Sequence, residues 1–303
     1  MSIDIAGAPV SFGVFELTDP AAMAHLPGPD RVLDVLASAG YTGVDLGPLG
    51  FLGRGEQLRE RLRRSRLALC GGWIDLPFSD DARFAAALPA LDTALAVFTD
   101  AADPAARPPK PTLADSGDER RRANPGGGAG LSLTGDHLAA FARNVAVAAR
   151  RIRDRGFEPT FHHHVGTYVE TPDEIDAFLD ACDVDLTFDT GHLLLGGGDP
   201  LAGWRRWSSR INHVHLKDAD LAVLQAVQAR RGSMVDVWAS RGFVALGEGD
   251  LDMAGIVAAV QGDGYDGWIV IEQDVLPTAD TSAAVLEQDQ VLNMTRLKEL
   301  LRR

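Results

Sequence analysis

Short apolar runs alternate along the chain with longer stretches of helical period, from the first residues to the last. We count eight strand-like runs, each followed by a candidate helix or loop-and-helix segment. Strands that alternate with helices in this way are typical of a parallel sheet built from βα units. The strands that the pattern predicts are 5–12, 43–47, 67–74, 111–115, 158–164, 185–191, 211–217 and 267–273.

Several predicted helices begin with Asp, Thr or Pro in the first turn. The best-marked start has Thr171 as the cap, Pro172 at the first helical position and Glu174 completing a capping box. Eight strand–helix pairs in 303 residues predict a single-domain (β/α)8 TIM barrel over residues 1–303. A doubly wound sheet with a second domain is the alternative, although no linker divides the chain. The predicted helices are 30–39, 56–65, 137–155, 173–181, 251–263 and 283–301.

Two segments interrupt the repeat. Residues 103–130 are rich in Pro, Gly and charged residues, so we expect a flexible loop around 103–136, broken only by the short strand. Its part 117–130 could close over a bound substrate as a lid. The glycines at 126–130 lack a following Gly-Lys-Ser/Thr, so they do not predict a phosphate site. Residues 219–245 form a second insertion, expected as an extra helix and a turn at the barrel mouth.

The composition is that of an ordinary globular protein, with 46% hydrophobic and 24% charged residues. No secretory leader and no run of about 18 apolar residues is present, so we expect a cytoplasmic protein that does not enter a membrane. A net charge of −14 repels phosphate backbones and argues against nucleic acid as a partner. Cys70 and Cys182 form no disulfide or metal motif and are expected to be buried apolar filler.

Six of the eight histidines occur in three short clusters, each at the end of an apolar run. The clusters read FHHHVGT (161–167), FDTGH (188–192) and HVHLKD (213–218), and a fourth strand ends in VIEQD (270–274). In a barrel these strand ends meet at one site, and alternation gives each cluster an inward-facing set of imidazoles and carboxylates. A divalent cation would satisfy such a buried group, and its mixed N/O donors suit Mn, Co, Fe, Ni or Zn.

A single histidine at a strand end is more often a polar residue with ordinary partners than a metal ligand. His163 and His213 could therefore support the site or pack in the core, and His25 and His137 are expected on the surface. Asp189 taken alone could be a helix cap, and Glu272 a solvated strand end. Four polar clusters at four strand ends make chance a poor explanation, so a metal site is the economical interpretation.

The sequence resembles the sugar-phosphate isomerase/epimerase, or xylose isomerase-like, barrels over nearly its whole length, and inosose dehydratases most of all. The resemblance is carried by APVSFGVFE, GYTGVDLGPLGFL, FHHHVGTYVETPDEID, FDTGHLLLGGGDP, INHVHLKD and GWIVIEQD. It implies four metal ligands, in strand order His162, Asp189, His215 and Glu272. Related epimerases have Glu at the first position, so His164 is the alternative to His162. Endonucleases with this barrel carry further histidines on strands two and three, which VDLGP and CGGWID lack.

The resemblance implies proton abstraction beside a ketone on a polyhydroxylated substrate. Dehydration of a keto-inositol is favoured; the alternatives are a keto-sugar epimerase or isomerase and a 3-keto-glycoside eliminating lyase. A non-catalytic sugar-binding protein is a remote alternative. Mn or Co is the favoured divalent ion, with Zn, Fe, Ni or Mg as alternatives, and a homodimer is compatible because barrels of this family often pair.

For proton transfer we predict Lys217, abstracting the α-proton, and His192, protonating the departing hydroxyl, with the two roles interchangeable. A nearby cation and partial burial should lower the pKa of Lys217. The alternative is that Lys217 only pairs with Asp218, Asp220 or Asp274. The predicted substrate-binding residues are His164, Trp73, Glu16 and Asp274.

Overall fold

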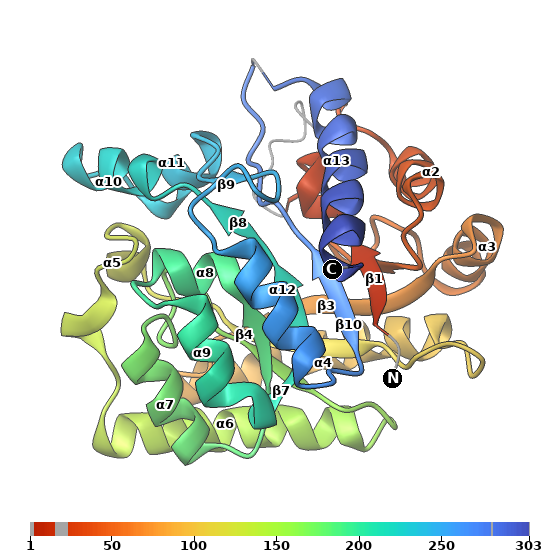
Figure 1. Ribbon diagram of the computed structural model, residues 1–303. Helices are drawn as coiled ribbons and strands as arrows, with labels where there is room; N and C mark the ends of the chain where they lie inside the picture. Colours follow the sequence, from red (N-terminus) through yellow and green to blue (C-terminus); the bar gives the residue numbers. More distant parts are fainter. Residues whose placement is uncertain (1–2, 16–23, 280, 303) are drawn as a thin grey trace.

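The chain folds into a closed barrel of parallel strands with helices around it (Figure 1). The computed structural model describes residues 3–15, 24–279 and 281–302, apart from the side chain of Ala129. Around the barrel the strands follow chain order, and β10 closes the ring by pairing with β1. This confirms the predicted (β/α)8 barrel and rules out the doubly wound sheet. The barrel strands are β1 (Asp4–Gly7), β2 (Gly43–Asp45), β3 (Ala68–Leu76), β4 (Lys110–Asp115), β5 (Thr160–His162), β6 (Leu186–Asp189), β7 (Ile211–Leu216) and β10 (Trp268–Ile271).

Several predicted strands extend too far, and in two of them a helix that follows directly gives the reason. The strand predicted at 5–12 ends at Gly7, because Pro9 begins the 3-10 helix η1 (Pro9–Phe12), which ends at Gly13 with φ 79°. The strand predicted at 185–191 ends at Asp189, which caps helix α8 (Thr190–Leu195) by accepting from the backbone N–H of His192. The polar residues after β6 therefore stand on the first turn of a helix.

The predicted helices all occur, with ends shifted by at most two residues from the predictions. The capping box of α7 is present as predicted, with Thr171 and Glu174 exchanging hydrogen bonds. Figure 1 shows these helices around the barrel. They are α2 (Pro29–Ala39), α3 (Gly55–Ser65), α6 (Gly135–Arg153), α7 (Pro172–Ala181), α12 (Met253–Gly262) and α13 (Ala283–Leu301), and α9 (Pro200–Trp207) adds to this layer.

Helix α4 (Asp81–Ala101) is missing from the predicted helices. Its interior contains Pro89, and its apolar residues are spread widely around the helix, so the sequence shows no clear amphipathic period. By length and composition α4 could cross a membrane. Its residues Phe84, Leu91 and Phe98 are instead buried in the hydrophobic core. Packing against the barrel therefore accounts for its apolar composition.

Alternation along the strands separates an apolar layer outside the barrel from the polar strand ends that face its interior. Phe161 of β5 packs outward against Phe178 of α7, with ring centroids 4.2 Å apart, and against Phe141 of α6. Burying one such aromatic side chain contributes about 1.5–3 kcal/mol. The next residue, His162, must then face the barrel interior. The core that holds the helices in place thus also orients the polar strand ends.

The two interruptions contain more regular structure than we predicted. Segment 103–136 includes β4, helix α5 (Glu119–Arg122) and the 3-10 helix η2 (Gly128–Leu131). Arg121 is buried, so the expectation that this segment lacks packed structure is wrong there. Segment 219–245 holds two helices, α10 (Leu221–Ala229) and α11 (Met234–Ala239), between the paired strands β8 (Asp218–Ala219) and β9 (Phe243–Val244). Lid motion stays a prediction.

Candidate active site

Four polar side chains from four strands converge at the carboxyl end of the barrel. His162 ends β5, Asp189 ends β6, His215 lies in β7 and Glu272 follows β10. All four are buried, and one potential ligand atom of each lies within 4.8 Å of the others. Cross-strand register contributes directly, because Asp189 pairs with His215 and Val270 pairs with His215 on the other side. The structure therefore brings together the four residues that we predicted as metal ligands, which we call the four-donor group.

The contacts inside the four-donor group leave ligand atoms free. His162 Nε2 lies 3.2 Å from Asp189 Oδ2, and His215 Nδ1 lies 3.0 Å from Glu272 Oε2. Among the described residues, His162 Nδ1 and His215 Nε2 have no hydrogen-bond partner. A buried polar atom without a partner costs about 1–3 kcal/mol. Two imidazoles and two carboxylates with spare donor atoms suit a divalent transition metal, so these residues could hold one.

The protonation states of three residues of the group also fit metal binding, whereas burial is outweighed at His215 by Glu272 and Asp189, which raise the pKa of that imidazole. Burial lowers the pKa of His162, which keeps that imidazole neutral. Burial alone would raise the pKa of Glu272, but His215 and Lys217 outweigh it and lower the pKa to about 2. The carboxyl of Asp189 is also ionised. Burial alone would raise its pKa, but Lys217 and other neighbours lower the pKa well below the ordinary value. Neutral imidazole and ionised carboxylate are the forms that bind metals.

Lys217 lies among the carboxylates of this site. Its Nζ is 2.8 Å from Asp274 Oδ1, 3.1 Å from Asp189 Oδ2 and 3.2 Å from Glu272 Oε2. Burial lowers the pKa of Lys217, but the three carboxylates together outweigh burial and raise it. The predicted fall in this pKa depends on a cation beside Lys217 and stays a prediction. Of the three predicted alternative partners, Asp274 is the one that Lys217 contacts.

A second group lies beside the first and consists of His164, His192 and Asp274. His192 Nε2 lies 3.2 Å from Asp274 Oδ2, and its ring stacks on His164 with centroids 3.6 Å apart. His164 Nδ1 lies 2.7 Å from the carbonyl oxygen of Val165. His164 therefore belongs to this second group, whereas His162 belongs to the four-donor group. Asp274 links the two groups by contacting both Lys217 and His192.

The remaining clustered histidines support the site from outside the two groups. His163 Nε2 accepts a hydrogen bond of 3.2 Å from the backbone N–H of Asp189, which helps to hold that residue. His213 is buried two residues before His215, with ring centroids 5.2 Å apart, and neither of its nitrogens has a partner among the described residues. These positions agree with the support and packing roles that we considered for them.

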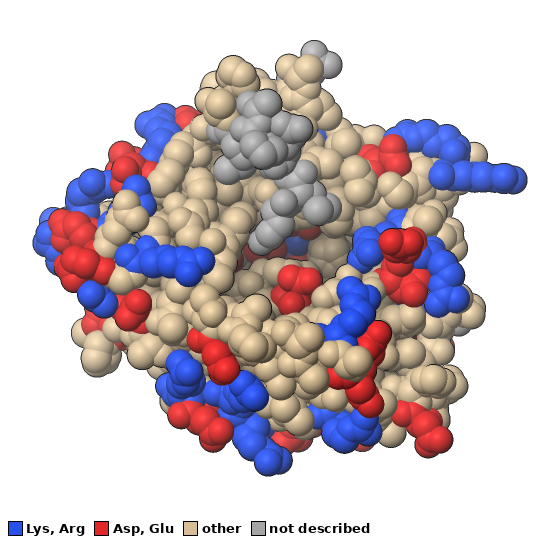
Figure 2. Space-filling view, turned by 180° about the vertical axis from the view of Figure 1, so that it is seen from behind, with Lys and Arg blue, Asp and Glu red and all other residues tan. Residues whose placement is uncertain are grey.

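A cavity of about 430 Å³ opens onto these groups. It is lined by all of the four-donor group except Asp189, and by Lys217. His192 is fully buried and does not line it, so its predicted contact with substrate oxygen would need a rearrangement. Figure 2 shows one face of the molecule with a central hollow in which acidic side chains are visible. Of the predicted substrate-binding residues, Glu16 lies outside the described residues, and the cavity is lined by His164, Trp73 and Asp274.

The cavity also has polar lining residues that we did not predict. Asp45, Asp75 and Asp115 lie at or near the carboxyl ends of β2, β3 and β4 and line the cavity. The strand-end rule that selected Asp189 would have found them, but they stand without a neighbouring histidine. Burial raises the pKa of Asp115 to about 6. Trp238 from α11 also lines the cavity, in agreement with the predicted position of segment 219–245 at the barrel mouth.

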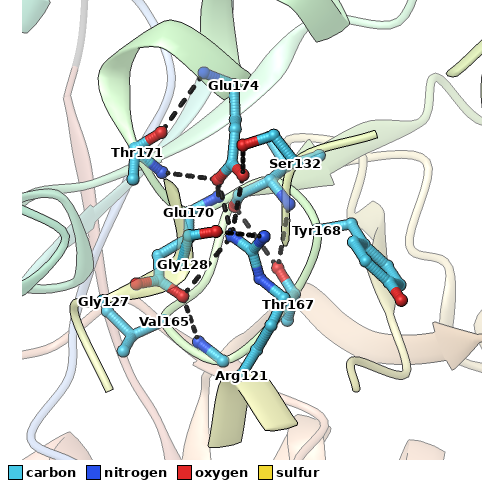
Figure 3. Close-up of polar contacts among 12 residues, drawn as sticks. Arg121, Gly127, Gly128, Ser132, Val165, Thr167, Tyr168, Glu170, Thr171 and Glu174 are labelled. Carbon is cyan, nitrogen blue, oxygen red and sulfur yellow. Dashed lines mark hydrogen bonds and ion pairs between the residues drawn. The ribbon is translucent and has the colours of Figure 1, made fainter. Parts of the chain in front are cut away.

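A buried ion-pair cluster ties two cavity loops together (Figure 3). Arg121 Nη2 lies 2.9 and 2.7 Å from the two carboxylate oxygens of Glu174, and 3.7 Å from Glu170 Oε2. The carbonyl oxygen of Gly128 accepts a further bond of 3.0 Å from Arg121 Nη1. Glu170 Oε2 in turn accepts from the backbone N–H of Gly166, which lines the cavity. The cluster thus fixes the loop after β4 against the loop after β5.

A closed parallel barrel with clustered imidazoles, carboxylates and a lysine at its carboxyl end is typical of a class of enzymes. The sequence profile of the xylose isomerase-like TIM barrel family matches residues 33–289, so this chain belongs to that family. It is accordingly a sugar-modifying enzyme of the xylose isomerase-like kind, as the resemblance predicted.

Relatives and solved structures agree with this assignment. The chain is 29% identical to the rhizopine catabolism protein MocC of Rhizobium meliloti, covering 91% of this chain and 83% of the relative. It is 30% identical to an inosose dehydratase of Geobacillus kaustophilus, covering 82% and 80%. With the inosose dehydratase of Lacticaseibacillus casei it is 36% identical, but that match covers only 48% of this chain and 50% of the relative. The fold resembles that of the IolI protein with a bound zinc atom, with TM-score 0.66, 10% identity and 97% of each chain covered.

Proposed function

We propose that this enzyme is a metal-dependent lyase that removes water from a polyhydroxylated ring ketone, with a keto-inositol as the first substrate to test. The observation that carries the proposal is the four-donor group, three of whose residues line a cavity together with Lys217 and further carboxylates. Similarity to proteins named inosose dehydratase supports the choice of substrate and reaction. Solved epimerases share only the fold, which leaves epimerisation as the competing outcome.

The proposed cofactor is a divalent metal ion held by His162, Asp189, His215 and Glu272. When bound, such an ion would supply Lewis-acid chemistry next to the substrate ketone. Imidazole ligands favour Mn, Co, Zn, Fe or Ni over Mg. The zinc atom in the IolI structure, which has a similar fold, supports a divalent metal as cofactor without deciding which ion this enzyme uses.

Lys217 is the proposed proton-transfer residue, because its ammonium lines the cavity and lies next to the four-donor group. In the metal-free protein the three carboxylates favour the charged amine. A metal ion bound to Asp189 and Glu272 would add positive charge beside Lys217 and oppose its ammonium form. The pKa of Lys217 would then fall, which favours the neutral amine that can abstract a proton. Lys217 then takes the α-proton and returns it to the hydroxyl that leaves as water.

We propose that His192 acts through Asp274 rather than on the substrate. Its imidazole is buried behind His164 and contacts Asp274 Oδ2, while Asp274 Oδ1 holds Lys217. A neutral His192 in this position keeps Asp274 turned toward the Lys217 amine. This replaces our prediction that His192 protonates the departing hydroxyl directly.

The test is a substrate panel on protein reconstituted with Mn²⁺ or Co²⁺. Keto-inositols and keto-sugars are incubated with the enzyme, and products are followed by ultraviolet absorbance and NMR. A dehydratase produces an enone or diketone chromophore and releases water. Epimerised or isomerised ketone without a chromophore would replace the dehydratase with the competing reaction. No turnover of any member, with metal bound, would refute the proposed function.

A further inference from the structure

Helix α5 carries three consecutive arginines, and its turn of about 100° per residue points them in different directions. Arg120 is exposed and pairs with Asp118 at 3.0 Å. Arg121 is buried in the ion-pair cluster of Figure 3. Arg122 is half-buried and lines the cavity. One short helix thus supplies a surface charge, a structural anchor and a cavity residue.

The side chain of Arg122 packs between two glycines. Gly117 and Gly166 have φ angles of +76° and +88°, in the left-handed region that favours glycine. A Cβ on Gly166 would lie 3.0 Å from Cγ of Arg122, and a Cβ on Gly117 would lie 2.9 Å from its Nη1. Larger residues at either position would push against Arg122. The two loops that the Arg121 cluster joins therefore also hold Arg122 in place.

The guanidinium of Arg122 has hydrogen-bond donors to spare. Its Nη1 donates to the carbonyl oxygen of Ser116 at 2.6 Å, and within the described residues it makes no ion pair. The other lysine or arginine among the described lining residues, Lys217, is already surrounded by three carboxylates. An arginine carries five N–H donors in a planar fork that spans two oxygen atoms. A ligand in this cavity therefore meets one cation that is free to bind its oxygens.

We propose that Arg122 is a specificity-determining residue that donates to two adjacent ring oxygens of the substrate, on the part that does not bind the four-donor group. This inference rests on the proposed function, because it takes the substrate to be a polyhydroxylated ring. A vicinal diol matches the spacing of the guanidinium fork. The contact is the same before and after proton transfer, so it contributes to binding rather than to the chemical step.

The experiment compares Arg122→Met, Arg122→Lys and Arg120→Met with the wild type, all loaded with Mn²⁺. Arg120→Met is the matched control, since it removes an arginine of the same helix that faces solvent. Calorimetry measures the affinity for myo-inositol, a polyol that lacks a ketone to react, and for quinate, a ring polyol with a carboxylate. Steady-state kinetics with a keto-inositol and its deoxy analogues separates KM from kcat.

Arg122→Met should weaken myo-inositol binding and raise KM about 10- to 100-fold, as expected for losing hydrogen bonds to a charged donor, with kcat little changed. Arg122→Lys should recover part of the loss, and Arg120→Met should behave as wild type. One deoxy analogue should show almost no penalty in Arg122→Met, because its missing hydroxyl is the one that Arg122 binds.

Three results would overturn the inference. The first is unchanged myo-inositol affinity and KM in Arg122→Met. The second is a loss confined to quinate, which would make Arg122 an anion site. The third is a wild type that binds neither polyol. Inactivity of the wild type on every ketone would refute the proposed function instead, and Arg122-dependent myo-inositol binding would still support this contact.

Discussion

Replacing Arg121 by Met should destabilise the protein far more than replacing either neighbouring arginine. Arg121 is fully buried, and its guanidinium donates to both oxygens of Glu174 at 2.9 and 2.7 Å. Met fills most of the volume but leaves Glu174 and Glu170 buried without their cation. Removing one partner of a buried pair costs about 3–5 kcal/mol, whereas an exposed pair such as Arg120 with Asp118 is worth about 1 kcal/mol or less.

Urea unfolding of the wild type, Arg121→Met and Arg120→Met measures this difference as a change in midpoint at constant slope. Arg121→Met combined with Glu174→Gln should recover part of the loss, because the neutral amide keeps the capping acceptor and removes the unpaired charge. Unfolding measured over a series of pH values tests the direction of the charge effect. Burial raises the pKa of Glu174, but Arg121, Ser132 and Thr171 outweigh burial and lower it. The stability from this pair is therefore present above about pH 4.5 and lost as the pH falls below it.

A free energy of unfolding for Arg121→Met within about 1 kcal/mol of the wild type, as expected for Arg120→Met, would contradict this prediction. A double variant less stable than Arg121→Met alone would also contradict it, since the cost would then come from lost packing and not from an uncompensated carboxylate.

Three further predictions concern the cavity. Burial raises the pKa of Asp115 from 3.8 to about 6, so stability should decline as the pH rises through this range. Asp115→Asn should remove that decline and raise the free energy of unfolding at pH 7 by on the order of 1–3 kcal/mol. Urea unfolding from pH 4 to 7 measures this, and an unchanged free energy of unfolding at pH 7 would contradict it. Lys217→Met should retain metal and ligand binding but lose at least about a hundredfold in turnover, and near-normal turnover would reduce Lys217 to an ion-pair partner. Amide exchange in segment 117–130 should slow at saturating substrate, and unchanged exchange would exclude a lid.

The sequence was sufficient for the barrel and for the convergence of polar clusters at its strand ends, because both follow from short-range patterns, and the family resemblance then indicated the four-donor group among them. Apolar strands that end in His, Asp or Glu recur at the spacing of βα units, and parallel strand ends must meet. Asp45, Asp75 and Asp115 follow the same rule, but each is a single carboxylate near its strand end, whereas each predicted cluster contains a histidine or two carboxylates. Helix α4 was missed because Pro89 and its evenly spread apolar residues conceal the helical period.

The charge state of Lys217 and the packing of the loop after β4 depend on partners far along the chain. Lys217 contacts Asp274, 57 residues away, and that carboxylate with two others outweighs burial and raises the pKa of Lys217. Arg121 contacts Glu174, 53 residues away, so a stretch rich in Gly, Pro and arginine is packed where composition alone indicates a loop. Neither pairing has a signal in local sequence.

Metal content is the most direct test of the account. After reconstitution with Mn²⁺ and removal of free ion, elemental analysis should find a single ion per chain in the wild type. His162 and His164 are matched probes, because they stand two residues apart at one strand end but belong to different groups. His162→Asn should lose the ion, as should Asp189→Asn, while His164→Asn should keep it. A wild type without bound metal, or an ion retained in His162→Asn and lost in His164→Asn, would contradict the central claim.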